Sequence, residues 1–263
     1  EFFSNNIINN SNFNNKAKII TSFAMFYDLE DPIEFAKSIA NAINKQDGLW
    51  VLEQSYLPTM LSQNAYDTIC HEHLEYYSLK QIIWILEKSN LKLIDVELTD
   101  TNGGSFVIYC SHREAKYKPN EKNISNVKRF EKNLKLNEIE IYKNFYESIL
   151  KSREELINFI NEKKQNNEKV LAIGASTKGN VILQFCGFTS DDIEFIGEIN
   201  EEKLGSMTPG TNIPIKSEEE VLMSECKNIL ILPWHFKNFF VNSNNFKNKT
   251  LVFPLPKLEI IDC

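Results

Sequence analysis

A strand, a helix and a second strand, joined by short turns near the start of the chain, constrain its fold more than any other feature. Residues 18–23 read as a buried strand. Asp31-Pro32 indicates a helix start, because Asp caps a helix and Pro suits its first turn. A turn at Asp47-Gly48 then leads into a strand over residues 49–53. Such a unit requires parallel pairing, so the sequence predicts an α/β layer structure.

The next segment predicts a helix followed by a hairpin. Ser78 and Gln81 have the spacing of a capping box for a helix over residues 79–89. Strands are expected at residues 91–98 and 105–110, with a turn at residues 101–104 between them. A connection this short favours antiparallel pairing of the two strands.

A second α/β pattern begins at Lys169. Residues 170–173 read as a strand, residues 174–179 as a tight turn and residues 180–186 as a helix. Further strands are expected at residues 195–197, 229–232 and 251–253, the last of which closes the set. This order is typical of a small doubly wound, Rossmann-like domain.

The segment between the two patterns is highly charged. Apolar residues recur every three or four positions over residues 120–167, which predicts one or two long amphipathic helices. They could form a coiled coil or a partner surface, but a connector that packs on its own domains is favoured. We therefore predict three parts, at residues 1–115, 116–166 and 167–263.

Composition excludes several classes of protein. The net charge of −7 argues against a nucleic-acid binder, and no apolar run reaches the roughly 20 residues that span a bilayer. The five cysteines are scattered and form no CxxC pair, which favours a reducing compartment and no metal site in this chain. The polar, Asn-rich first fifteen residues read as a loop. We expect a soluble, cytoplasmic protein with no nucleic-acid or membrane partner.

The densest group of reactive side chains lies at residues 66–77. It holds two of the four histidines, His71 and His73, flanked by carboxylates. An extended backbone would point both histidines to one side and Cys70 and Glu72 to the other. A histidine titrates near neutral pH, and a neighbouring carboxylate can fix its tautomer, so acid–base chemistry is favoured over a plain surface cluster. A metal site is disfavoured because no third ligand has a usual spacing.

A second candidate is the turn of residues 174–180, between a predicted strand and helix. Its glycines allow a close backbone turn, the helix start offers N–H groups to a phosphate, and Lys178 adds a charge. It is neither a Walker loop nor a full GxGxxG, and no acidic ribose ligand is evident downstream. A purely topological turn is an equal alternative.

Three further turns, at residues 103–105, 207–211 and 232–236, form a third group. The last two lie where strands of the second domain end, the side on which open α/β sheets bind ligands. Trp234 and His235 could stack on or bond to a base or sugar. Ordinary turns with a capping aromatic are equally compatible with the sequence.

Four of these segments occur together in a recognisable order. They are Tyr-Asp-Thr-Ile-Cys-His-Glu-His-Leu-Glu-Tyr-Tyr-Ser (66–78), Asn-Gly-Gly-Ser-Phe (102–106), Gly-Ala-Ser-Thr-Lys-Gly-Asn (174–180) and Thr-Pro-Gly-Thr-Asn-Ile-Pro-Ile (208–215). Together they resemble the sugar C-methyltransferase family, which methylates nucleotide-linked keto-deoxysugars with S-adenosylmethionine. The resemblance covers the chain from Lys18 onward. It implies a zinc-binding module, a class I methyltransferase domain and a second Rossmann-like domain, with the sugar nucleotide between the last two.

Against that plan, the strand at residues 18–23 resembles the fourth strand of the methyltransferase sheet. The resemblance therefore implies the C-terminal half of a methyltransferase domain followed by a Rossmann-like α/β domain, from an N-terminally longer protein. The zinc module, the Gly-rich cofactor loop and its acidic ribose ligand would precede this chain. Cofactor contacts would come from Ser22, Phe23, Ala24, Met25 and Phe26, and S-adenosylmethionine binding by the chain alone is expected to be feeble.

The resemblance also implies roles at the reacting centre. His73 would be the base or proton shuttle, Glu72 would orient it, and His71 lies beside them. Removing a proton next to a ketone gives an enolate that attacks the methyl group. Tyr27-Asp28 stands where the family often has a histidine, and Cys70 where it often has a tyrosine. These changes leave the sugar open, and also whether carbon or oxygen is methylated.

Substrate binding is implied for seven residues, namely Gly174, Ser176, Lys178, Asn180, Asn102, Trp234 and His235. A non-catalytic nucleotide-sugar-binding or scaffold protein of the same fold is the main alternative. An NAD-dependent oxidoreductase is disfavoured because the ribose-binding acid is missing. The oligomeric state stays open.

Overall fold

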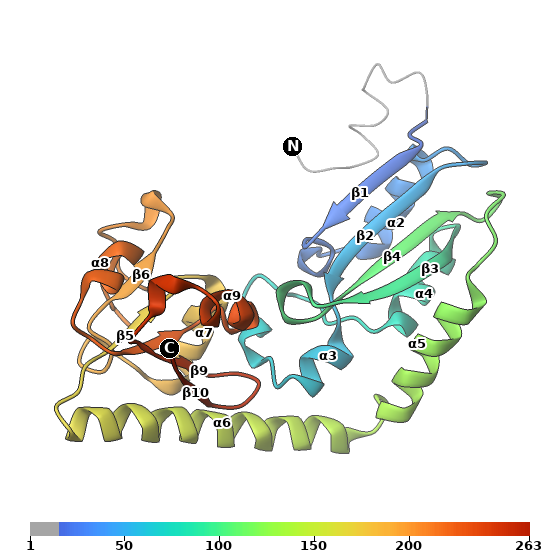
Figure 1. Ribbon diagram of the computed structural model, residues 1–263. Helices are drawn as coiled ribbons and strands as arrows, with labels where there is room; N and C mark the ends of the chain where they lie inside the picture. The colour runs from blue at the N-terminus through green and yellow to red at the C-terminus, as the bar shows by residue number, and fades with distance from the viewer. Residues whose placement is uncertain (1–15) are drawn as a thin grey trace. The chain divides into compact units, whose positions relative to one another are not determined.

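The computed structural model describes residues 16–263, which form two compact units (Figure 1). Unit 1 holds the chain up to Met60 and His71–Ile141, and unit 2 holds Leu61–Cys70 and Tyr142–Cys263. The loop expected for the first fifteen residues lies outside the described range. The three-part domain division stays a prediction, because these two units divide the chain differently.

Unit 1 contains a four-stranded sheet of order β1-β2-β4-β3. Its strands are β1 (Ile19–Phe23), β2 (Leu49–Ser55), β3 (Leu91–Thr99) and β4 (Ser105–His112). β1 and β2 pair in parallel, and β3 and β4 form an antiparallel hairpin. The parallel strand–helix–strand unit and the hairpin are therefore confirmed.

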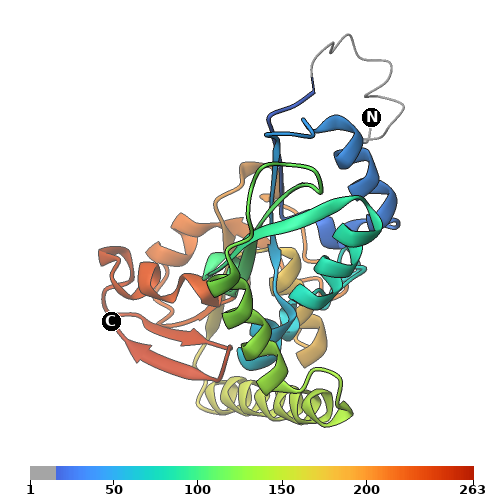
Figure 2. The ribbon, with the colours of Figure 1, turned by 90° about the vertical axis from the view of Figure 1, so that its right-hand side faces the viewer.

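Two helices, α2 (Pro32–Ala42) and α4 (Leu79–Lys88), cover one face of this sheet (Figure 2). Asp31 caps α2 by accepting a hydrogen bond from Glu34 N at 2.9 Å. Ser78 and Gln81 form the predicted capping box of α4. The apolar faces of both helices bury against Trp50, Leu52, Phe106 and Ile108 of the sheet.

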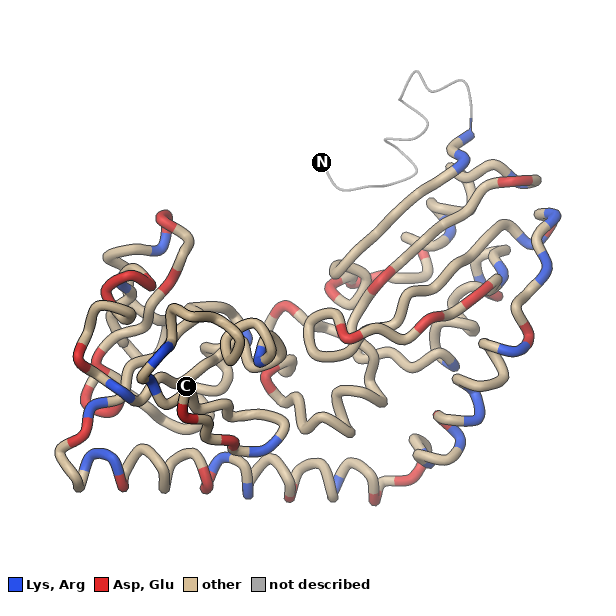
Figure 3. Tube along the Cα trace, viewed as in Figure 1, with Lys and Arg blue, Asp and Glu red and all other residues tan. Residues whose placement is uncertain are grey.

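The charged connector consists of two helices, α5 (Glu121–Leu134) and α6 (Ile139–Gln165), along which basic and acidic residues alternate (Figure 3). α5 packs on β3 in unit 1, and Glu131 reaches inward to accept hydrogen bonds from Tyr56 Oη and Leu79 N. α6 packs on unit 2, where Arg153 Nε donates to Phe185 O at 2.6 Å. Packing of the connector on the chain's own units is thus what the structure shows.

Unit 2 contains a six-stranded sheet of order β10-β9-β8-β5-β6-β7, parallel except for β10. The chain starts at β5, moves outward through β6 and β7, and returns to β8 on the other side of β5. The Rossmann-like fold class is therefore confirmed. The strands are β5 (Val170–Ile173), β6 (Ile196–Glu198), β7 (Ile215–Ser217), β8 (Asn228–Ile231), β9 (Thr250–Phe253) and β10 (Glu259–Asp262).

Two of these strands were not expected from the sequence. β7 has only three residues, which is too short for a periodic signal. The expectation that residues 251–253 close the sheet is wrong, because β10 adds an antiparallel edge strand beyond β9. The remaining helices are α3 (Leu57–Ser62), α7 (Thr177–Cys186), α8 (Glu218–Met223) and α9 (Lys237–Val241).

Helix α7 begins three residues earlier than predicted. Ser176 is its N-cap and accepts a hydrogen bond from Gly179 N at 3.1 Å. Gly179, expected in the turn, lies inside the helix, where an added Cβ would meet Gly174 O at 2.9 Å and Leu232 Cβ at 3.2 Å. The glycine is needed there for close packing of helix and strand.

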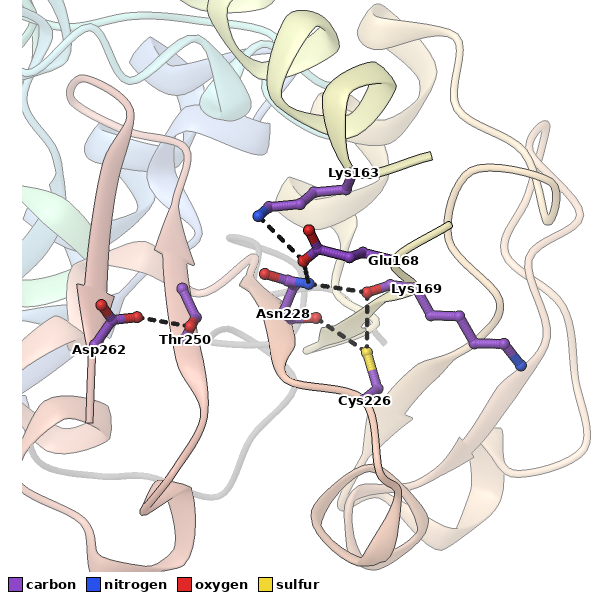
Figure 4. Close-up of polar contacts among 7 residues, drawn as sticks. All are labelled: Lys163, Glu168, Lys169, Cys226, Asn228, Thr250 and Asp262. Atoms are coloured by element: carbon purple, nitrogen blue, oxygen red, sulfur yellow. Dashed lines mark hydrogen bonds and ion pairs between the residues drawn. The ribbon is translucent and has the colours of Figure 1, made fainter. Parts of the chain in front are cut away.

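Side-chain hydrogen bonds join the end of α6 to the amino ends of β5 and β8 (Figure 4). Glu168 Oε2 lies 3.2 Å from Lys163 Nζ and accepts from Asn228 Nδ2 at 3.2 Å. Asn228 Nδ2 also donates to Lys169 O at 3.2 Å. These contacts fix the connection from α6 to β5. They lie at the amino ends of the strands, opposite the turns that carry the predicted ligand-binding residues.

Within residues 16–263, no helix is both long and apolar enough to cross a membrane. The same residues contain no cluster of His, Cys, Asp and Glu suited to a metal ion. All five cysteines are free.

Candidate functional site

The 66–78 motif passes from unit 2 into unit 1. Tyr66–Thr68 form a short 3-10 helix in unit 2, and His71 and Glu72 lie in a turn. The extended backbone expected here is therefore wrong, and so is the alternation of side chains derived from it. Local hydrogen bonds such as Cys70 N to Thr68 O, at 3.1 Å, favour the turn over an extended strand.

In unit 1, His73 lies against the segment that follows β1. Its ring centroid is 4.2 Å from that of Tyr27, and Leu74 N donates to Tyr27 O at 3.0 Å. Partial burial raises the pKa of the nearby Asp28 carboxyl, while His73 lowers this pKa and Glu72 raises it. The structure thus brings His73, Asp28 and Glu72 together, and leaves His71 exposed.

Two of the five predicted cofactor-binding residues, Ser22 and Phe26, have structural roles in unit 1. Phe26 is 1% exposed, with its ring centroid 5.7 Å from Trp50 and 5.5 Å from Tyr77. Ser22 Oγ accepts a hydrogen bond from Trp50 Nε1 at 2.8 Å. Both side chains hold the end of β1 in place.

The other three predicted cofactor-binding residues, at and after the end of β1, are exposed or half-buried. Phe23 is 57% exposed, Ala24 has a left-handed backbone with φ of 50°, and Met25 is half-buried. Ala24 N donates to Glu53 O at 2.9 Å. Glu53 Oε1 and both side-chain polar atoms of Gln54 are buried without a hydrogen-bond partner among residues 16–263. This stretch therefore offers accessible backbone beside a buried carboxylate.

In unit 2, Asp67 joins the turns after β5 and β8. Its carboxylate is fully buried and accepts a hydrogen bond from Trp234 Nε1 at 2.8 Å. Burial lowers the pKa of Lys178, while Asp67 and Cys70 raise it. Burial, and then the Lys178 charge, lower the pKa of His235 to about 4. Lys178, Trp234 and His235 therefore lie in one group, with Asp67 as a fourth member that the sequence reasoning missed.

The turn after β5 has the backbone of a close-approach loop. Gly174 has φ of 93°, and an added Cβ would lie 2.6 Å from Pro233 Cδ, so only glycine fits. Asn180 Oδ1 and His235 Nδ1 are buried atoms that lack a hydrogen-bond partner in the described part of the chain. Free buried polar atoms of this kind suit a polar ligand.

Of the remaining predicted residues, Asn102 is exposed in the β3–β4 turn of unit 1. The 207–211 segment in unit 2 is a structural turn, since Thr208 and Thr211 are buried and hydrogen-bonded to each other.

A cavity of about 560 Å³ opens at the carboxyl ends of β5 and β6 in unit 2. Gly174 and Ser176 line it on one side, and Glu198 at the end of β6 lines it on the other. An acid, Glu198, therefore lies at the end of the strand that follows the glycine turn, where the sequence analysis identified none. An acid at the end of the second strand, roughly 20 residues after the glycine turn, is the signal that would have found it. The predicted strand stopped one residue short of Glu198.

Comparisons with known proteins match both parts of the chain to methyltransferase family models. Residues 100–256 match a family model described as the C-methyltransferase C-terminal domain, and residues 2–96 match a methyltransferase domain. C-methyltransferase NovU from Streptomyces niveus is 26% identical over 253 residues, which are 93% of this chain and 59% of NovU. The chain thus spans about three-fifths of the length of this curated relative.

A solved structure of a LepI variant in complex with SAH and a substrate analogue aligns over 37% of this chain and 26% of its own. Its sequence identity of 15% and TM-score of 0.32 are too low to support an argument about the fold. The C-terminal family model, in contrast, covers more than half of the chain and includes three of the four motifs in full, at residues 102–106, 174–180 and 208–215. The chain belongs to the C-methyltransferase family.

Proposed function

We propose that the protein containing this chain is an S-adenosylmethionine-dependent C-methyltransferase acting on a nucleotide-linked keto-deoxysugar or a related small polar substrate. Family membership supports the reaction class. The observation that carries the proposal is the packing of His73 on Tyr27, next to the Asp28 carboxyl in unit 1. A histidine beside carboxylates is suited to moving a proton near neutral pH.

In this proposal, His73 removes a proton from the carbon next to the ketone. The electron pair of that bond moves toward the carbonyl oxygen, which leaves an enolate whose carbon can accept a methyl group. Glu72 and Asp28 stabilise the imidazolium that His73 becomes, because opposite charges nearby favour the protonated ring. Tyr27 limits the orientations of the ring by packing against it at 4.2 Å.

The end of β1 fits part of a bound cofactor. S-adenosylmethionine supplies, when bound, an electrophilic methyl group on a cationic sulfur. Phe23 and Ala24 leave backbone accessible there, and Glu53 adds a buried carboxylate whose Oε1 has no partner within residues 16–263. A carboxylate is the group expected beside a cation. Ser22 and Phe26 would act indirectly, by holding this backbone.

Unit 2 would hold the nucleotide end of the substrate. The start of α7 offers N–H groups to a phosphate, and Lys178 adds a positive charge. Asn180 and His235 each present a buried polar atom to a ligand. Trp234, fixed by Asp67, completes this side.

The decisive experiment uses the full-length protein and a His73→Ala variant. We expect kcat for methyl transfer to fall by at least about 100-fold, the usual contribution of a general base, with an unchanged thermal unfolding midpoint. Lys80→Ala, an exposed residue on α4, is the control and should keep the wild-type rate. An unchanged rate in His73→Ala would overturn the assignment of the base. Sugar-nucleotide binding without turnover of any substrate would favour the non-catalytic alternative.

A further inference from the structure

A buried carboxylate occupies the inner face of α5, at a position where the helical pattern calls for an apolar residue. Ile124 and Val127 of this face are buried, and Glu131, four positions after Val127, is only 8% exposed. A carboxylate that leaves water costs free energy unless hydrogen bonds replace its hydration. Proteins break their local patterns in this way chiefly at functional or strained sites.

Glu131 is bonded to two parts of unit 1 that are distant in the sequence. Its Oε1 accepts hydrogen bonds from Tyr56 Oη at 2.9 Å and from Leu79 N at 2.6 Å. Burial, and then Glu131, raise the pKa of Tyr56, so its hydroxyl keeps its proton and remains a donor at neutral pH. Leu79 is the first residue of α4, and an N–H group there has no acceptor within its own helix. The carboxylate therefore ties α5 to the residue that follows β2 and to the start of α4.

The start of α4 is also the end of the segment that carries the proposed base. Residues 73–78 run from His73 to α4 without regular secondary structure. Leu74 N and Glu75 N donate to Tyr27 O at 3.0 and 3.1 Å. These two bonds anchor the first part of the segment beside the ring on which His73 packs.

The far end of the segment is anchored beside Glu131. Tyr77 O accepts a hydrogen bond from Leu57 N at 2.9 Å, and two residues later Leu79 N donates to Glu131. An irregular segment has no repeating ladder of hydrogen bonds, so its course depends on the contacts that hold its two ends. Loss of the Glu131 contact would therefore release this end and, through the segment, His73.

We propose that Glu131 is a positioning residue, which holds His73 in place by fixing the end of the segment that carries it. The role requires the length of the Glu131 side chain, because a single oxygen must reach both donors, and it does not require the charge. This inference rests on the proposed function, because it takes His73 to be the base.

Three variants of the full-length protein separate side-chain length from charge. Glu131→Gln keeps the length and removes the charge, Glu131→Asp keeps the charge on a shorter side chain, and Glu131→Ala removes both. NMR of protein with selectively labelled histidine and tyrosine measures the contact between the His73 and Tyr27 rings, and His73→Ala identifies the signal. We expect the nuclear Overhauser effect between these rings to persist in Glu131→Gln and to be lost in Glu131→Asp and Glu131→Ala.

Turnover gives a second readout, in the assay used for His73→Ala. The kcat for methyl transfer should fall about 10-fold in Glu131→Asp, because a displaced base loses its alignment with the reacting carbon, and should stay at the wild-type value in Glu131→Gln. The KM for S-adenosylmethionine should be unchanged in both, since the contacts of Glu131 lie at Tyr56 and Leu79 and not at the end of β1. Lys132→Ala, at the exposed neighbouring position of α5, is the control and should change neither the ring contact nor kcat.

A ring contact that persists in Glu131→Asp and Glu131→Ala would overturn the inference, as would a wild-type kcat in Glu131→Asp. Loss of the contact in Glu131→Gln would also overturn it, because the effect would then come from the charge. All three results leave the proposed function standing. A wild-type rate in His73→Ala, in contrast, would overturn the proposed base together with the inference that rests on it.

Discussion

His73 and His71 show how the fold separates two like residues. His73 is half-buried against Tyr27, within electrostatic reach of Asp28, whereas His71 is exposed on the preceding turn. Residues 71–72 form a turn, whereas His73 lies in the irregular segment after it, next to Tyr27. Of these two histidines, His73 is therefore the one that we propose as the base.

His235 gives a pH-dependent prediction. Burial lowers its pKa to about 4, whereas a histidine in the unfolded chain titrates near 6.5. Between these values the unfolded chain binds a proton that the folded chain does not, so stability falls as the pH decreases through this window. Replacing His235 by Asn should therefore reduce the loss in unfolding midpoint between pH 7 and pH 5, measured by thermal denaturation.

His71→Asn is the matched control, since it removes an exposed histidine. Its unfolding midpoint should fall between pH 7 and pH 5 by as much as that of the wild type. If the midpoint of His235→Asn also falls by this amount, the explanation by burial is contradicted.

The turn between β5 and α7 positions more of the candidate site than any other element. Gly174, which precedes α7, and Gly187, which caps its C-terminal end, both have positive φ values, of 93° and 73°. Only Gly174 is also crowded, since an added Cβ would lie 2.6 Å from Pro233 Cδ, whereas nothing lies within 4 Å of one at Gly187. An alanine at Gly187 would therefore report the cost of backbone strain alone, whereas an alanine at Gly174 would report that strain together with steric overlap.

We predict that Gly187→Ala lowers the free energy of unfolding by about 1 kcal/mol, the cost of a left-handed alanine. Gly174→Ala should cost at least about 2 kcal/mol, because overlap with Pro233 adds to the same strain. Chemical denaturation measures both values. Equal losses in the two variants would show that the loop after β8 yields to the added methyl group.

Several elements could be predicted because their signals are local. Asp31, Ser78 and Gln81 cap helices through hydrogen bonds to backbone or side chains within three residues. Ser176 caps α7 in the same way, but the glycines around it hid the helix start. β7 and β10 escaped prediction because they are short edge strands, whose pairing comes from neighbours distant in sequence.

For the whole molecule, the two units have different parts of the proposed function. Unit 2 contains the glycine turn, the cavity and Glu198. In the described residues of unit 1 the glycines are Gly48, Gly103 and Gly104, and none of them lies between the end of a strand and the start of an α-helix. Such a turn is what binds the phosphate or ribose side of a nucleotide in α/β folds. In the proposed function, unit 1 therefore supplies only part of a cofactor site within residues 16–263.

The chain alone should accordingly bind S-adenosylmethionine more weakly than about 1 mM in a calorimetric titration. The full-length protein is the positive control and should bind the cofactor measurably under the same conditions. A matching thermal transition of unit 2 in both samples would show that the chain is folded. Tight binding by the chain alone would contradict the prediction.

The sequence by itself determined the α/β class, the parallel unit near the start, the hairpin, the Rossmann-like order of unit 2 and the family. The first four follow from periodicity, caps and turn residues, which act over a few positions, whereas the family follows from the resemblance of four motifs. Only the tertiary structure decided that Asp67 bonds Trp234, 167 positions away, and that Glu198 faces the turn at Gly174. Contacts of this kind depend on which strands become neighbours, and no local pattern of residues records that choice.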